Sequence, residues 1–108
     1  MALEELHFEH EVAGAAAEGD RHWLHVGYVS SGDLEILAEG RPEHPSLLKT
    51  HVTTSIVGYG AIWRAVIGDF ARRRGFGGYE IWINDNAATP AVAKLRLEQL
   101  YQESRTKR

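Results

Sequence analysis

The chain has no cysteine among its 108 residues, which excludes disulfide bonds, thiolate zinc sites and a cysteine nucleophile. It also has no apolar run that approaches the roughly 20 residues of a membrane-spanning helix. The N-terminal stretch MALEELHFEHE is acidic and lacks the basic and apolar regions of a secretory signal. These absences predict a soluble, cytoplasmic protein.

Length and composition predict one small globular domain over residues 1–108. Hydrophobic residues make up 44% of the chain, which is enough for a single core and argues against disorder. The net charge of −3 argues against nucleic-acid binding, for which domains are usually basic. The charges are separated along the chain. Residues 1–54 hold ten acids, three bases and all six histidines, whereas residues 55–108 hold five acids and nine bases.

The first half of the chain has the alternating pattern of β-strands. Apolar and polar residues alternate in four stretches, and we expect strands there: residues 3–12, 23–29, 34–38 and 47–56. In the second strand Leu24, Val26 and Tyr28 are expected to face the same way. The stretch Ser30-Ser31-Gly32-Asp33 predicts a tight turn in which glycine adopts a positive φ. A β-hairpin should therefore join the second and third strands.

The second half changes to helical spacing. Ile62, Val66 and Phe70 recur at helical intervals, so a helix is expected over residues 58–74, ended by the glycines from Gly75 on. A short strand over 79–83 follows. Thr89 and Pro90 are typical of a helix start, and that helix should run to about residue 103. The order β-hairpin, β, α, β, α predicts an α+β fold, with a mostly antiparallel sheet covered by two helices.

Ser31 is the first residue that we consider for chemistry. A serine at an exposed turn beside a glycine presents its hydroxyl without bulky neighbours. It is a nucleophile, a modification site or only a turn former. Nucleophilic catalysis also needs a general base and an oxyanion hole, and residues 27–32 do not match the Gly-x-Ser-x-Gly elbow. The residues alone favour a turn former.

Two further groups of residues are interpreted structurally. The histidine pairs 7/10 and 22/25 have a spacing that places their members on opposite faces of a strand, which disfavours a metal site. The stretches Gly58-Tyr59-Gly60 and Asn84-Asp85-Asn86 are interpreted as a strand-to-helix turn and a polar turn.

A run of three arginines has two interpretations. Arg72, Arg73 and Arg74 end the first predicted helix, where positive charge complements the helix dipole. The alternative is a docking patch for phosphates or for an acidic partner.

Two stretches carry a resemblance to a known family. Residues 29–37, VSSGDLEIL, and residues 83–99, INDNAATPAVAKLRLEQ, resemble the acyl carrier protein (delta) subunit of bacterial malonate decarboxylase. The similarity runs from about residue 23 to residue 103, after a variable segment at 1–22 and before a tail at 104–108. The gamma carrier subunit of citrate lyase is a more distant relative.

The resemblance implies a carrier function without catalysis by this chain. In that family the serine of Ser-Gly-Asp carries phosphoribosyl-dephospho-CoA through a phosphodiester. This implies that Ser31 is the attachment residue, with Gly32 and Asp33 completing the motif. The thiol of the group bears acetyl and malonyl in turn. The implied partners are the acyl transferase and decarboxylase subunits and the enzyme that attaches the group.

Three alternatives remain open at this point. The first is a carrier of the citrate lyase type. The second is a small interaction or anion-binding domain that uses Arg72, Arg73 and Arg74 while Ser31 stays unmodified. The third is a minimal hydrolase with Ser31 as its nucleophile.

Overall fold

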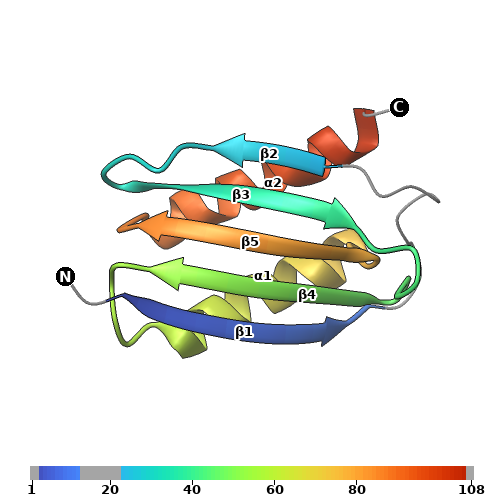
Figure 1. The fold of residues 1–108 in the computed structure, drawn as a ribbon, viewed down its shortest axis with the longest axis horizontal. Helices are drawn as coiled ribbons and strands as arrows, with labels where there is room; N and C mark the ends of the chain where they lie inside the picture. The colour runs from blue at the N-terminus through green and yellow to red at the C-terminus, as the bar shows by residue number, and fades with distance from the viewer. Residues whose placement is uncertain (1–2, 13–22, 107–108) are drawn as a thin grey trace.

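A computed structural model describes residues 3–12 and 23–106 of the chain. These residues form five strands and two helices (Figure 1). The strands are β1 (Glu4–Glu11), β2 (Trp23–Gly27), β3 (Asp33–Gly40), β4 (Leu47–Thr54) and β5 (Tyr79–Asn86). The helices are α1 (Gly60–Arg74) and α2 (Pro90–Thr106).

The strands form one sheet in the order β1-β4-β5-β3-β2. The pairs β1–β4, β2–β3 and β3–β5 are antiparallel, and β4–β5 is parallel. The parallel pair needs a crossover, which α1 supplies. Both helices lie behind the sheet in the view of Figure 1, so they cover one face and leave the other open. The predicted α+β class with a mostly antiparallel sheet is confirmed, and the strand expected over residues 3–12 is β1, at one edge of the sheet.

The core lies between the sheet and the two helices. Alternate residues of the central strands face the helices and are fully buried, including Leu34, Ile36 and Ile81. From the helices, Ile67 and Leu97 pack onto this face and are almost completely buried. The two-residue period of the strands and the helical period of α1 and α2 thus meet in one apolar layer.

Some predicted apolar positions do not belong to the core. Tyr28 is 69% exposed, because β2 ends at Gly27, whose φ of +82° breaks the alternation of the strand. Ile56 and Ile62 are 38% and 45% exposed, since β4 ends at Thr54 and Ile62 lies off the buried stripe of α1.

The polar stretch 84–86 was predicted as a turn, and that prediction is wrong. These residues continue β5, which pairs with β3 on one side and β4 on the other. Side chains of the neighbouring strands form hydrogen bonds with these polar residues. The Asn84 amide donates to Glu35 over 2.8 Å, and the Thr54 hydroxyl donates to Asp85 over 2.8 Å. The turn follows instead at Ala87, whose φ is +65°.

Several other predictions about the elements are confirmed. Gly58 has a φ of +100° in the turn before α1, and Gly75 ends that helix in the left-handed conformation. At the start of α2, the Thr89 hydroxyl accepts a hydrogen bond from the N–H of Val92 over 3.2 Å. Residues 13–22, which include His22 of the second histidine pair, lie outside the described part of the chain, as do the first two and the last two residues. Within that part, neither helix has the length and apolar character needed to cross a membrane.

The layered fold explains why the charges separate along the sequence. Four of the five strands come from the acidic half of the chain, and both helices come from the basic half. On the open face of the sheet, alternation along the strands places six glutamates: Glu5, Glu9, Glu11, Glu35, Glu39 and Glu80. The helices hold seven arginines and lysines against three acids. One face of the domain is therefore acidic, and the helical layer is basic.

Candidate functional site: a serine at a hairpin tip beside an apolar pocket

Ser31 lies in the connection between β2 and β3 and is exposed. The next residue, Gly32, has a φ of +78°, and a Cβ built on it would meet no atom within 4 Å. In the described residues, no side chain forms a hydrogen bond with the Ser31 hydroxyl. The hydroxyl is therefore accessible to a large group, and no side chain in the described part of the chain is hydrogen-bonded to it in the way that a general base would be.

The backbone of this tip is held in place by three hydrogen bonds. The N–H of Gly32 donates to the carbonyl of Asn86 over 2.7 Å, which joins the tip to the end of β5. The N–H of Asp33 donates to the carbonyl of Ser30 over 2.9 Å and closes the turn. The N–H of Tyr28 donates to the carbonyl of Leu34 over 3.0 Å. The predicted hairpin is thus confirmed, as is the positive φ of its glycine.

The motif residue Asp33 braces the tip against α2. Two Arg96 nitrogens, Nη2 and Nε, donate to the two Asp33 carboxylate oxygens over 2.6 and 3.0 Å. The N–H of Leu34 donates to the same carboxylate over 2.7 Å. The Arg96 guanidinium also lies 5.8 Å from the centre of the Tyr28 ring. A fork of this kind is a strong and directional contact. Asp33 therefore positions the loop around Ser31.

This brace predicts a dependence of stability on acid. The hydrogen bond from Arg96, followed by that from the Leu34 N–H, lowers the pKa of Asp33. A lowered pKa stabilises the fold above the ordinary aspartate pKa of about 3.9 and loses this contribution as pH falls through the folded value. We expect Asp33→Asn to lower the free energy of unfolding at neutral pH, by an amount that shrinks in acid.

Urea unfolding of the wild type and of Asp33→Asn, from neutral pH into acid, measures the difference between their free energies of unfolding. Asp69→Asn is the matched control, because the ion pair between Asp69 and Arg73 is exposed and lies within one helix, so it contributes little. A difference between wild type and Asp33→Asn that stays constant into acid would contradict the assignment.

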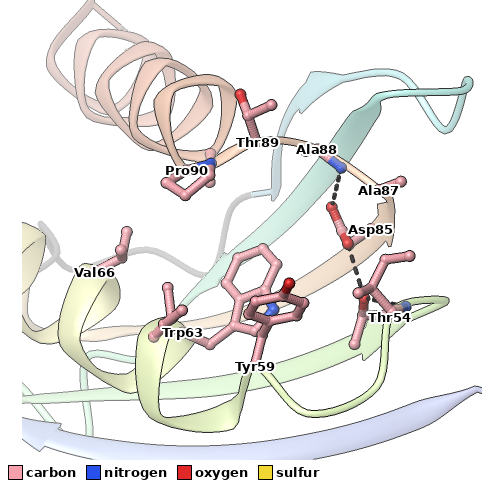
Figure 2. A pocket seen from close by; sticks show the side chains of 12 residues that line it. Thr54, Tyr59, Trp63, Val66, Asp85, Ala87, Ala88, Thr89 and Pro90 are labelled. Carbon is pink, nitrogen blue, oxygen red and sulfur yellow. Dashed lines mark hydrogen bonds between the residues drawn. The ribbon is translucent and has the colours of Figure 1, made fainter.

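A pocket of about 350 Å³ opens at the same end of the sheet as the tip (Figure 2). It lies between the carboxyl ends of β4 and β5 and the first turns of α1 and α2. Its lining is mainly apolar and includes Tyr59, Trp63 and Val66. Ala87 also lines it and directly follows Asn86, the residue that bonds to Gly32. The serine tip and the pocket are therefore neighbours in the fold.

Asp85 is the one buried acid of the described residues, and it lines this pocket. Its Oδ2 accepts from the Thr54 hydroxyl over 2.8 Å, and its Oδ1 accepts from the N–H of Ala88 over 3.1 Å. The prediction of a turn at residues 84–86 did not identify Asp85 as a buried residue of a pocket. The alternation through Tyr79, Ile81 and Ile83 could have placed Asp85 on the buried face.

The three arginines of α1 have different surroundings. Arg74 pairs with Glu98 of α2 over 2.6 Å and stacks over Tyr101, 4.6 Å from the ring centre. Arg73 pairs with Asp69 one turn earlier in the helix over 3.1 Å. Arg72 is exposed. Arg74 thus joins the two helices, and Arg72 and Arg73 remain candidates for docking.

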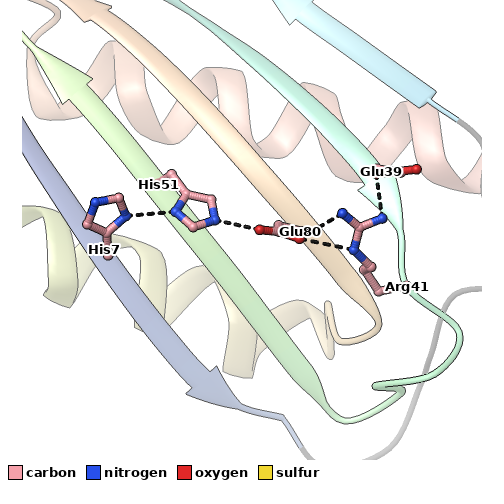
Figure 3. Close-up of polar contacts among 5 residues, drawn as sticks. All are labelled: His7, Glu39, Arg41, His51 and Glu80. Carbon is pink, nitrogen blue, oxygen red and sulfur yellow. Dashed lines mark hydrogen bonds and ion pairs between the residues drawn. The ribbon is translucent and has the colours of Figure 1, made fainter.

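Three of the described histidines, His7, His10 and His51, lie on β1 and β4, which are not strands of the serine hairpin. His7 and His10 face opposite sides of β1, as predicted. On the open face His7 Nδ1 and His51 Nδ1 lie 2.7 Å apart, and a polar chain continues from His51 through Glu80 to Arg41 (Figure 3). His10 faces α1, where burial lowers its pKa. No cluster of three or more metal-ligating side chains occurs in the described part of the chain.

The fold and the tip define a class of protein: a small α+β domain, covered by helices on one face of its sheet, that displays an exposed serine on a braced hairpin. Residues 21–104 match the family model of the malonate decarboxylase delta subunit. The chain belongs to this family.

Individual relatives agree with this assignment. A malonate decarboxylase acyl carrier protein of Bradyrhizobium diazoefficiens is 44% identical over 97 residues, which are 90% of each chain. One from Stenotrophomonas maltophilia is 47% identical over 78 residues, 68% of this chain and 69% of the relative. A chain in the crystal structure of a Pseudomonas malonate decarboxylase hetero-tetramer in complex with malonate is 36% identical. It aligns with a TM-score of 0.78 over 94% of this chain and 98% of that chain.

Proposed function

We propose that this protein is the acyl carrier subunit of a malonate decarboxylase and that Ser31 carries phosphoribosyl-dephospho-CoA through a phosphodiester. The observation that carries the proposal is the exposed Ser31 on a braced tip, in a chain whose relatives are named acyl carrier proteins of this enzyme. When bound, the group supplies a thiol that bears acetyl and malonyl as thioesters, and a thioester delocalises the carbanion left by loss of carbon dioxide.

The residues of this chain fit attachment better than catalysis. A serine that is modified once by a separate transferase needs access, which the open space beside Gly32 provides. It needs no base of its own, and its hydroxyl has none within hydrogen-bonding distance in the described residues. The brace between Asp33 and Arg96 fixes where the arm begins. An arm attached at Ser31 would supply its thioester to the partner active sites at high effective concentration.

The proposed partners are the acyl transferase and decarboxylase subunits and the enzyme that attaches the group. A relative in this fold forms part of a hetero-tetramer, which supports assembly of the present chain with other subunits. Their chemistry, rather than that of this chain, would transfer malonyl and release carbon dioxide.

Reconstitution tests the proposal. Purified transferase and decarboxylase subunits are mixed with malonate, with or without this chain, and carbon dioxide release is measured. We expect release only with the chain that carries its prosthetic group. Release without the chain, or equal release with the unmodified chain, would contradict the proposal. Turnover of citrate instead of malonate, with citrate lyase subunits, would assign a carrier of the citrate lyase type.

The exposed Arg72 and Arg73 at the end of α1 are expected to contribute to the binding of partner subunits in a way that depends on salt. We expect Arg72→Gln combined with Arg73→Gln to weaken binding to the partner subunits at low salt and to have little effect at high salt, because exposed charges are screened. The free energy of unfolding should change by less than about 1 kcal/mol, since the ion pair between Arg73 and Asp69 that is lost is exposed. Titration calorimetry at two salt concentrations measures the effect. Unchanged binding at low salt would leave only the helix-dipole role.

A further inference from the structure

The pocket beside the serine tip has features that the attachment of a group to Ser31 does not by itself require. Tyr59 and Ile62 at its rim are 48% and 45% exposed, and Val57 in the same loop is 61% exposed. Trp63 lies deeper, at 7% exposure. Adjacent exposed apolar groups around a concave site are typical of ligand binding.

We infer that this pocket binds the adenine base of the prosthetic group carried on Ser31. The inference rests on the proposed function, because dephospho-CoA supplies the base. It adds a noncovalent binding site on this chain to the covalent attachment residue. The base would sit against Tyr59 and Trp63, and the thiol end of the arm would remain free.

Location supports this assignment. Gly32, next to Ser31, donates through its N–H to Asn86, and Ala87 follows in the lining of the pocket. The nucleotide part of the group follows the phosphodiester, so it is the part that lies nearest the attachment point. A short tether gives the base a high effective concentration at the pocket, and weak contacts are then enough to hold it.

The pocket has room for a planar base. Its volume of about 350 Å³ is more than ten times the roughly 30 Å³ that a water molecule occupies in the liquid, and bonded atoms pack more closely than separate waters. A purine base with its amino group has about ten non-hydrogen atoms, and the whole arm is far larger than this space. The pocket therefore selects one segment of the arm.

The chemistry of the lining favours adenine over the acyl end. Aromatic and aliphatic walls suit a planar ring. The carboxylate of Asp85 uses two acceptor positions for Thr54 and Ala88, and a carboxylate has about four, so it can also accept from the exocyclic amino group of adenine. A malonyl carboxylate in the same place would be buried next to another carboxylate, which is unfavourable.

Nuclear magnetic resonance of the indole N–H groups tests the inference, because the three tryptophans provide their own controls. Trp63 lines the pocket. Trp23 and Trp82 lie on the open face of the sheet, with ring centres 5.6 Å apart. Spectra are compared for the unmodified chain and for the chain whose attached group has been verified by intact mass. We expect attachment to shift the Trp63 signal and to leave the other two in place.

Variants then locate the contact. Ile62→Glu introduces a charge at the pocket rim at a position exposed enough to keep the fold, and it should remove most of the Trp63 shift. Leu95→Glu is the matched control: Leu95 is 53% exposed on α2 and does not line this pocket, so the shift should remain. Acetylation of the thiol should leave the Trp63 signal unchanged, because the base and not the acyl end occupies the pocket.

The outcomes separate this inference from the proposed function. Absence of the added mass would overturn the carrier assignment, and this inference with it. The added mass without a Trp63 shift would overturn this inference alone. So would a Trp63 shift that depends on acetylation, which would assign the pocket to the acyl end. A shift that appears only after partner subunits are added would assign it to a partner side chain and would also overturn the inference.

Discussion

Replacing Ser31 with alanine abolishes carbon dioxide release from malonate by a complex reconstituted around this chain, whereas Ser30→Ala retains it. This is the expected result if Ser31 Oγ is the attachment atom. The two serines are adjacent, and both are exposed. They differ in role, because the Ser30 carbonyl accepts the hydrogen bond that closes the turn and Ser31 occupies the open position before Gly32.

The reason for complete loss is chemical. Alanine has no side-chain oxygen to form the phosphodiester, so the prosthetic group that carries malonyl cannot be attached. The hydroxyl of Ser30 is not in the position to replace it. The side chain of Ser31 makes no hydrogen bond in the described residues, and both serines are exposed. The free energies of unfolding of both variants should therefore lie within about 0.5 kcal/mol of the wild-type value. Activity that survives Ser31→Ala but disappears in Ser30→Ala would move the attachment site by one residue.

The second large effect concerns Gly27, the glycine at the end of β2. Gly27 has a φ of +82°, and a Cβ built on it would lie 2.1 Å from the carbonyl oxygen of Leu34. Gly27→Ala thus combines the strain of a left-handed backbone with a clash against backbone atoms that cannot move without breaking the β2–β3 pairing. We expect it to lower the free energy of unfolding by about 3 kcal/mol or more.

Gly32→Ala is the matched control for this prediction. Gly32 has a similar φ of +78°, but its Cβ would meet no atom within 4 Å. Its cost should therefore be the backbone strain alone, about 1–2 kcal/mol. Urea unfolding of both variants measures the two costs. Equal losses would show that the contact with the Leu34 carbonyl does not constrain the loop.

Local patterns in the sequence predicted most of the fold. Alternation along β3 and β4 and the helical spacing of α1 depend on neighbouring residues. They placed much of the core, including Phe70, although Ile62 of the predicted stripe is exposed. The hairpin and its positive-φ glycine also followed from local turn chemistry. The N-terminal start of α2 at Thr89 and Pro90 was likewise predictable, because capping requires only residues within one turn.

The predictions that were wrong depended on contacts between residues far apart in the chain. The strand character of Asn84 and Asp85 comes from Glu35 and Thr54, which supply partners for polar groups in a central strand. A single sequence does not reveal such partners. The brace between Asp33 and Arg96 joins residues 63 positions apart, and the pocket exists only where α1, α2 and β5 meet. Ser31 was found as the candidate site from a motif of neighbouring residues. The contacts that hold its hairpin in place involve residues that are distant in the sequence.

The mass of the intact chain tests the central claim most directly. The protein is co-expressed with the two enzymes that make and attach the prosthetic group, purified and analysed by intact-mass and peptide fragmentation. The account predicts a gain equal to phosphoribosyl-dephospho-CoA, located on Ser31 and absent from the Ser31→Ala variant. An unmodified mass in the presence of active enzymes, or a gain that persists in Ser31→Ala, would contradict it.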